Sequence, residues 1–267
     1  MLLSNFKISF QSHGSSVCII KPEDEQIHFT HPAKVALIAS TSDKLCAQAS
    51  QLMQQFATEQ GIKKYLLLNE GYVAAIGVQA VKKAIRPYLV LHFSPEWVEI
   101  CLVEPQSCTL AGHGLQATAP LRLICHKSMP YNGLRQFIRG RYSILISRHE
   151  EQRILELAAN DNFCSHVEIS GINPHIGVGS SMIFDFNQWV EYRSLRQRII
   201  RQSVADCLVE WKDFEPRGIF LTGDYQSYMP LKDVWYGGIN GEPITIADNA
   251  DTAVKEGFAL LHAHSKK

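Results

Sequence analysis

Apolar and polar residues follow two different periods within residues 63–104, the most informative stretch of the chain. Residues 65–68 form a short apolar run that stops just before Glu70, and a run of this length predicts a buried strand. The Ala-rich residues 73–80 favour a helix that Pro87 closes, because the proline ring removes a backbone donor. The pattern therefore predicts a strand followed directly by a helix.

Strand patterns surround this unit. Apolar or alternating runs predict strands at residues 6–10, 17–20, 27–29, 35–39, 88–93 and 97–103. The first three would form a meander, and the last two a hairpin with a tight turn. A helix that ends at Gly61 follows residues 35–39, with apolar positions at Leu45, Ala49, Leu52, Met53 and Phe56. A strand, helix and strand in this order predict a right-handed crossover and a parallel strand pair.

The second half of the chain continues the alternation of helices and strands. Strands are predicted at 121–125, within 167–183, and at 218–222 and 243–247. Helices are predicted at 131–142, 186–211 and 251–262. The longest helix has an apolar side made of Trp189, Leu195, Ile199, Val204, Leu208 and Trp211.

Composition places the chain among ordinary globular proteins. Its 267 residues are 46% hydrophobic and 19% charged, and Lys+Arg and Asp+Glu both number 26, so charge gives no general attraction to nucleic acid. Seven cysteines without CxxC spacing indicate buried, reduced thiols. No apolar stretch is as long as a transmembrane helix and no signal peptide is recognisable. We therefore expect a cytoplasmic protein that reaches a membrane only through partners.

The central segment resembles that of bacterial actin-like proteins of the MreB (rod shape-determining) family. In that family an Ala-Ala-Ile-Gly helix follows an acidic strand end, as in residues 70–77 (EGYVAAIG), and a second match is residues 218–223 (GIFLTG). The resemblance also implies a turn at residues 126–129, before the helix over 131–142, where Lys127 could meet an anion. The resemblance implies an α/β fold of the actin and heat-shock-chaperone ATPase class, with two ribonuclease H-like lobes. The first lobe would be reduced, because a helix and an outer subdomain are missing after His31-Pro32-Ala33. The implied divisions are a first lobe over 1–103, a second lobe over 104–248 and a terminal helix over 249–267 that packs back on the first lobe.

The phosphate-binding loops of the family are not preserved in this chain. The matching positions are Ser9, Ser12, Ser15, His92, Ser94, Thr222 and Gly223. A phosphate clamp needs backbone N–H groups and glycines that allow close approach, whereas Pro95 has no N–H and Glu96 adds negative charge. We therefore expect a pseudo-ATPase that binds ATP and Mg²⁺ weakly or not at all, with no metal site.

Several candidate residues allow a second interpretation. Glu70 could orient an attacking water, and an active ATPase with divergent loops would use Ser9, Ser12, Glu70 and Thr222; otherwise Glu70 is a capping or solvated carboxylate. His92, Glu96 and Glu99 could form a metal site, although a single histidine at a strand end is more often a structural residue. Ser12, His13 and Ser15 could suggest nucleophilic catalysis, but a Ser-rich turn between strands is the better explanation.

Arginine-bearing helices are the candidate partner surfaces. They carry Arg135, Arg139, Arg141, Arg193, Arg196, Arg198 and Arg201, which could instead form solvated faces. The resemblance implies a scaffold or modulator in cell shape or cytoskeletal organisation, with protein partners such as an intact actin-like relative or a cell-shape complex. A domain that docks a membrane complex through these arginines is a further possibility.

Overall fold

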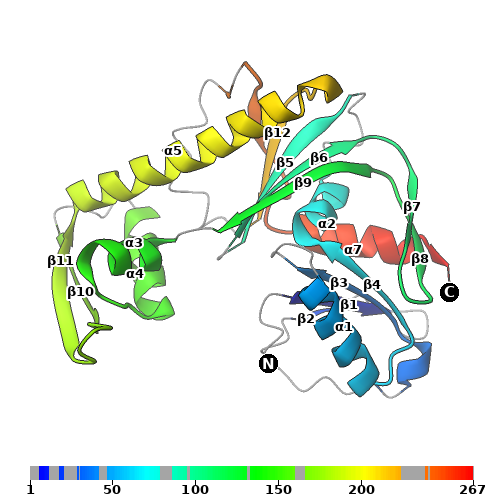
Figure 1. Ribbon diagram of the computed structural model, residues 1–267, viewed down its shortest axis with the longest axis horizontal. Coiled ribbons are helices and arrows are strands. Elements are labelled where there is room, and N and C mark those ends of the chain that lie inside the picture. The colour runs from blue at the N-terminus through cyan, green and yellow to red at the C-terminus, as the bar shows by residue number, and fades with distance from the viewer. Residues whose placement is uncertain are drawn as a thin grey trace.

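The computed structural model describes residues 6–11, 18–20, 29, 31–41, 47–78, 86–94, 97–130, 133–159, 166–223, 238–239 and 241–266. These residues form a mixed α/β fold around three hydrophobic cores (Figure 1). A central core lies between two sheets and under a long helix. A second core fills an outer lobe at one end of the molecule, and a third lies between the first sheet and one helix.

The first sheet has the strand order β2-β1-β3-β4. Its strands are β1 (Phe6–Gln11), β2 (Cys18–Ile20), β3 (Ala36–Thr41) and β4 (Lys64–Asn69). β1 is antiparallel to both β2 and β3, while β3 and β4 form the predicted parallel pair. The connection between β3 and β4 contains the predicted helix, α1 (Ala47–Glu59). The third predicted meander strand falls on residues 27 and 28, which are outside the described residues, and on Phe29, which is not in a strand.

β3 is buried on both faces because its side chains alternate between two cores. Leu37 and Ala39 pack with Met53 of α1, whereas Ala36 and Ile38 belong to the central core. This explains why the strand is a continuous apolar run. η1 (Pro32–Lys34), a short 3₁₀ helix, precedes the strand.

The second sheet has the order β13-β12-β5-β6-β9. Its strands are β5 (Tyr88–Phe93), β6 (Trp97–Glu104), β9 (Arg122–Pro130), β12 (Ile219–Gly223) and β13 (Ile244–Ile246). The predicted hairpin of β5 and β6 is confirmed. The turn predicted at 126–129 is wrong, because these residues continue β9 along β6.

Two helices, α2 (Glu70–Gly77) and α7 (Ala253–Ala263), pack against each other between the two sheets (Figure 1). α2 begins at the first residue after β4, earlier than predicted, and Val78 caps its end. The helix therefore does not continue to Pro87. All eight of its residues are buried, so packing supplies the stability that a helix of two turns lacks in isolation.

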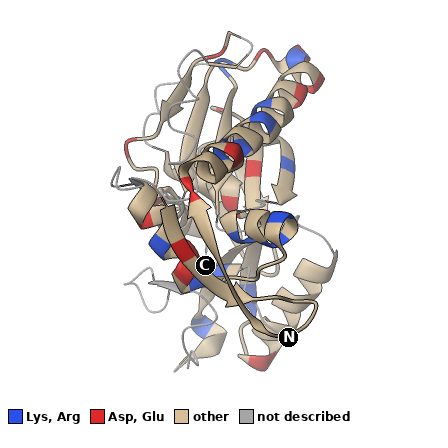
Figure 2. Cartoon of the chain, turned by 90° about the vertical axis from the view of Figure 1, so that its left-hand side faces the viewer, with Lys and Arg blue, Asp and Glu red and all other residues tan. Residues whose placement is uncertain are grey.

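The outer lobe is built from α3 (Leu134–Tyr142), α4 (Arg148–Ala159), the hairpin of β10 (His166–Ile172) and β11 (Gly179–Asp185), and the beginning of α5 (Phe186–Glu210). Figure 2 looks onto this end of the molecule. α5 starts with a capping box at Asp185 and continues across the second sheet. η3 (Lys212–Phe214) follows its end.

One helix, α5, contributes to two cores. Trp189 and Tyr192 belong to the outer core, and Ile200, Val204 and Cys207 to the central one. The predicted side of the helix is only partly correct: Leu195 and Ile199 are half-buried. The buried line instead runs through Tyr192, Arg196 and Ile200 at helical spacing, and it includes one aromatic and one charged residue that an apolar pattern omits.

A small sheet of order β14-β8-β7 places the end of the chain beside its middle. It contains β7 (Cys108–Ala111), β8 (Gln116–Ala119) and β14 (Ser265–Lys266). The predicted lobe boundary at 103 lies within the second sheet, at the end of β6, and α7 packs on α2; the three divisions remain predictions. Within the described part of the chain, no helix is both long and apolar enough to cross a membrane.

Candidate functional site

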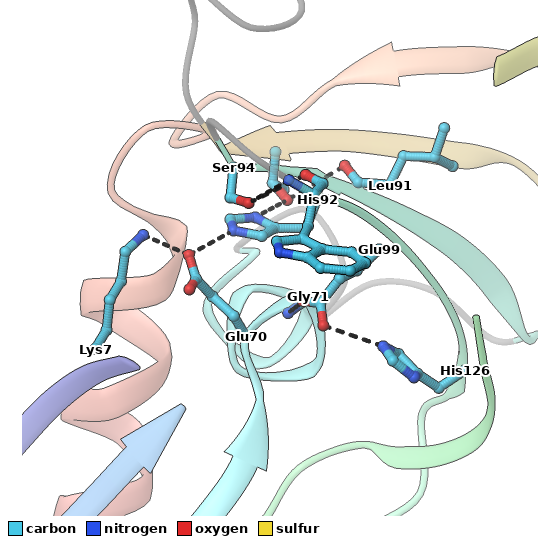
Figure 3. A network of polar contacts seen from close by, with 10 residues as sticks. Lys7, Glu70, Gly71, Leu91, His92, Ser94, Glu99 and His126 are labelled. Carbon is cyan, nitrogen blue, oxygen red and sulfur yellow. Dashed lines mark hydrogen bonds and ion pairs between the residues drawn. The ribbon is translucent and has the colours of Figure 1, made fainter. Parts of the chain in front are cut away.

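A buried polar network joins the two sheets at the beginning of α2 (Figure 3). Its centre is Glu70, the first residue of the helix, which forms an ion pair with Lys7 of β1. His92 of β5 places its Nε2 2.9 Å from Glu70 Oε1 and its Nδ1 3.0 Å from Thr222 Oγ1 of β12. A carboxylate is favourable at a helix N-terminus. Here Glu70 also links α2 to β1 and β5, and His92 extends these contacts to β12.

Glu70 is held as a carboxylate. Burial alone would raise its pKa, but the Lys7 ammonium and the hydrogen bond with His92 outweigh burial and hold the pKa at about 2. Because Glu70 is ionised, His92 Nε2 must carry the proton and donate. The Thr222 hydroxyl has two neighbouring acceptors, His92 Nδ1 at 3.0 Å and the Leu91 carbonyl oxygen at 3.4 Å.

A second carboxylate, Glu99 of β6, lies directly across from His92 in the β5–β6 register. It accepts a hydrogen bond from the Gly71 backbone N–H, and its Oε1 lies 3.1 Å from His126 Nε2 of β9. Burial raises the pKa of Glu99, and the hydrogen bond with His126 partly offsets this effect. A side chain at position 71 would meet Glu99, since a Cβ there would lie 2.9 Å from the Glu99 Cβ. Glu99 therefore caps α2 from a neighbouring strand.

The hydroxyl of Ser94 closes the turn between β5 and β6. Its Oγ donates to the Trp97 carbonyl oxygen and accepts from the Trp97 N–H, both at 3.1 Å. Ser94 thus supports the hairpin. Pro95 and Glu96, the other two turn residues, are outside the described residues.

Ser9 connects β1 to α7. Its Oγ lies 3.1 Å from His262 Nε2, and both residues are buried. Burial lowers the pKa of His262 to about 4, so the ring is neutral at physiological pH. Lys7 and Ser9 lie on the same side of β1 because side chains alternate along a strand. This side of β1, which carries Lys7 and Ser9, therefore faces α2 and α7.

The structure brings some of the predicted site residues together. Glu70, His92 and Thr222 form one chain of contacts. Ser9 and Ser94 make contacts outside this chain, Ser9 with His262 of α7 and Ser94 within the β5–β6 turn. Gly223 ends β12 with φ 105°, and its N–H donates to the Ala250 carbonyl oxygen at 2.8 Å. The remaining predicted positions, Ser12, His13 and Ser15, lie outside the described residues.

The described residues contain no group of three or more His, Cys, Asp or Glu side chains that could hold a metal ion. The suggested set of His92, Glu96 and Glu99 cannot be assessed in full, because Glu96 is outside them. Lys127 of β9 lies opposite Ile100 of β6, and the next residue, Ser128, lies opposite Glu99. Because side chains alternate along a strand, Lys127 is on the face of the sheet opposite to Glu99 and points away from the network. Burial raises the pKa of the Cys207 thiol in α5 to about 11, and the charge of Lys127 partly offsets this effect.

Two members of the network, Lys7 and His126, do not follow from the sequence pattern. The pattern puts Lys7 on a strand at residues 6–10, and the resemblance puts His126 in a turn. The only signal for Lys7 was its place beside Ile8 in an alternating strand, and nothing in the local pattern connects it to Glu70. The pair is separated by 63 residues, so only the packing of β1 against the start of α2 reveals it.

The arginines of the predicted partner surfaces are partly used inside the protein. Arg196 is buried, and Arg201 donates to the Gly238 carbonyl oxygen at 3.1 Å. Arg135 Nε donates to the Ile146 carbonyl oxygen at 3.2 Å, and Arg141 Nε lies 3.6 Å from Glu191. The two helices therefore do not present the continuous basic face that their sequences suggest.

Comparison with known proteins establishes the fold. No protein-family model matches the sequence, and no curated protein matches it. Two solved structures of MreB5 from Spiroplasma citri, one bound to AMPPNP and one to ADP, are similar to this chain with a TM-score of 0.53 and 13% identity. The alignments cover 84% of this chain and 67% and 68% of those chains, respectively. The chain therefore has an MreB-like, actin-like α/β fold, as the central segment predicted.

Proposed function

We propose that this chain is a degenerate MreB-like protein that acts through protein contacts, as a scaffold or modulator in cell shape or cytoskeletal organisation. In this proposal it is a pseudo-ATPase that binds ATP weakly or not at all. The observation that carries the proposal is the contact of Glu70 with Lys7 and His92. The acidic residue that an actin-like ATPase would direct toward its substrate is here neutralised by the protein's own side chains.

A hydrated Mg²⁺ ion binds through one or two available carboxylates, and the two buried carboxylates of this network already have partners within the protein. Glu70 is engaged by Lys7 and His92, and Glu99 by Gly71 and His126. The positive charge of Lys7 lies where a cation would otherwise be needed to balance Glu70. This supports weak or absent nucleotide binding.

The remaining parts of the proposal concern shape and partners. We propose two ribonuclease H-like lobes with a reduced first lobe. The candidate partner is a protein, such as an intact actin-like relative or a cell-shape complex, met in the cytoplasm or at a membrane that the partner binds. The support is the fold likeness to MreB5 and the short first sheet, which has four described strands.

One observation favours an alternative, an active ATPase with divergent phosphate loops. Glu70 is both buried and ionised, with its pKa at about 2, which is the charge state required of a residue that orients a water molecule. In that alternative, Glu70 and Thr222 would act on the substrate from the same network.

Thermal unfolding of the purified protein with and without millimolar Mg-ATP tests the proposal. A ligand at about 100 times its dissociation constant adds roughly 2.7 kcal/mol to the free energy of unfolding. We expect no shift and no hydrolysis. A shift that is lost in Thr222→Val but kept in Thr58→Val, on the exposed face of α1, would overturn the proposal in favour of the ATPase.

A further inference from the structure

The two edges of the outer hairpin differ in how their backbone groups are satisfied. The N–H and C=O of Ile172 both bond to Leu145, at 3.0 and 2.8 Å, so this residue turns its backbone away from β11. The Ser170 N–H donates to Glu150 Oε1 at 3.3 Å, and the Glu168 carbonyl accepts from Arg153 at 2.7 Å. The outer edge of β10 is therefore covered by α4 and the segment before it.

The same register identifies the free edge of β11. Glu168, Ser170 and Ile172 lie opposite Ile183, Ser181 and Gly179, respectively. In an antiparallel pair, opposite residues both turn their backbone groups toward each other or both turn them away. Gly179, Ser181 and Ile183 therefore direct their N–H and C=O groups to the outer edge. Among the described residues, none contacts these groups, and all three residues are exposed.

Natural proteins protect such edges with lysines, prolines or bulges, because an open strand is a template for further pairing. β11 has the sequence GSSMIFD, without a lysine, arginine or proline, and its register with β10 is regular. Seven of the ten exposed large apolar residues in the described part of the chain also lie in this lobe: Leu145, Ile172, Ile176, Val178, Ile183, Phe186 and Val190. In Figure 2 the hairpin is drawn largely in the colour of uncharged residues.

We propose that β11 is a self-association edge, on which the β11 strand of a second copy of this chain pairs antiparallel. A two-fold axis at Ser181 pairs that residue with its equivalent and pairs Gly179 with Ile183 of the second copy. Every outward N–H then meets an outward C=O. This inference does not depend on whether the protein binds a nucleotide.

The charge on β11 and the apolar surface beside it favour a second copy of this chain as the partner of the strand edge. Asp185 is the only charged residue of β11, and in this antiparallel arrangement the two Asp185 side chains lie at opposite ends of the new pair. Phe186 and Val190, 54% and 42% exposed, extend the apolar surface onto α5. A strand pair alone is smaller than a standard interface of about 800 Å² per partner, so we expect a concentration-dependent dimer.

Sedimentation of the purified full chain over a concentration series tests the proposal. The wild type is expected to shift from monomer to dimer, and Ile183→Lys to remain monomeric because it puts a charge on the edge. The control is Val209→Lys, at the far end of α5, where the exposed fraction is similar, 64% against 60%. It should dimerise like the wild type. A monomeric wild type, or an Ile183→Lys variant that dimerises equally, overturns the proposal.

Amide hydrogen exchange locates the contact independently. The Ser181 and Ile183 amides should become protected as concentration rises, while the Met182 amide, which faces β10, should be protected at every concentration. A dimer in which Ser181 and Ile183 exchange freely would use another surface and would also overturn the proposal. Ser181→Pro removes an outward N–H only, so it should abolish the dimer and leave the β10–β11 pairing in place.

Discussion

Gly77 of α2 and Gly257 of α7 each lie against the backbone of the other helix. A Cβ on Gly77 would be 1.8 Å from the Ala253 carbonyl oxygen, and one on Gly257 would be 1.9 Å from the Val73 carbonyl oxygen. The two helices can therefore approach as closely as they do only because both positions lack a side chain.

Replacing either glycine with alanine should destabilise the fold. Because the clashing atoms are backbone atoms of a buried helix, the two helices must move apart, at a cost of about 1 to 3 kcal/mol in the free energy of unfolding. Urea unfolding of Gly257→Ala measures this. The control is Gly140→Ala on α3, where a Cβ meets nothing within 4 Å, and alanine should be neutral or stabilising. Equal stability of the two variants would contradict the close contact.

Removing the Lys7 ammonium should weaken the fold through Glu70. Lys7→Met leaves a buried carboxylate with His92 as its remaining partner, and an uncompensated buried polar group costs about 1 to 3 kcal/mol or more. The double variant Lys7→Met/Glu70→Gln should recover part of this loss, since no charge remains to be compensated. A double-mutant cycle by chemical unfolding checks it. Additive losses in the two single variants would show that the pair is not coupled.

The two buried carboxyls should respond differently to neutralisation. The pKa of Glu70 is lowered to about 2, so its charge contributes stability that is present above about pH 4.5 and is lost as pH falls toward 2. The pKa of Glu99 is raised by burial, so the stability associated with its protonated form is lost as pH rises through that pKa. At pH 7, Glu70→Gln should therefore lower the melting temperature more than Glu99→Gln. The reverse order would contradict the assigned charge states.

His262 should make the free energy of unfolding depend on pH in a higher range than Glu70 does. Burial lowers its pKa from 6.5 to about 4, so the unfolded chain takes up a proton before the folded one does, and stability falls as pH decreases through this window. The loss amounts to roughly 2 to 4 kcal/mol. Unfolding free energies measured between pH 7 and 4 should show a flatter slope for His262→Gln. His175→Gln, at the exposed tip of the β10–β11 hairpin, should keep the wild-type slope.

The sequence was sufficient for elements whose signals are local. The strand at residues 65–68, a helix after it and the hairpin from Tyr88 to Glu104 were predicted from apolar period and turn residues, and each is present. The bounds of the helix were less accurate, because it begins at Glu70 and ends at Gly77 instead of covering residues 73–80. The fold family followed from the same segment. These predictions succeeded because the segment is buried on all sides, so its pattern reflects its surroundings directly.

The contacts of the candidate site could not be predicted in the same way. The ion pair of Lys7 with Glu70 and the hydrogen bond of His126 with Glu99 depend on which strands become neighbours. Lys7 alternates with Phe6 and Ile8 along β1, but this alternation does not show that α2 and α7 will cover its side of the strand. β9 continues five residues beyond the predicted strand at 121–125, and His126 is the first of these residues, 126–130. The local pattern therefore did not place His126 beside β6.

The length of α5 has a mechanical consequence. Trp189 in the outer core and Val204 in the central core belong to one helix, and 15 residues of helix correspond to about 22 Å. The two cores are therefore held a fixed distance apart for as long as both contacts of α5 persist. A displacement of the outer lobe that keeps Trp189 in its core must move α5 relative to the second sheet or break the contacts of Val204.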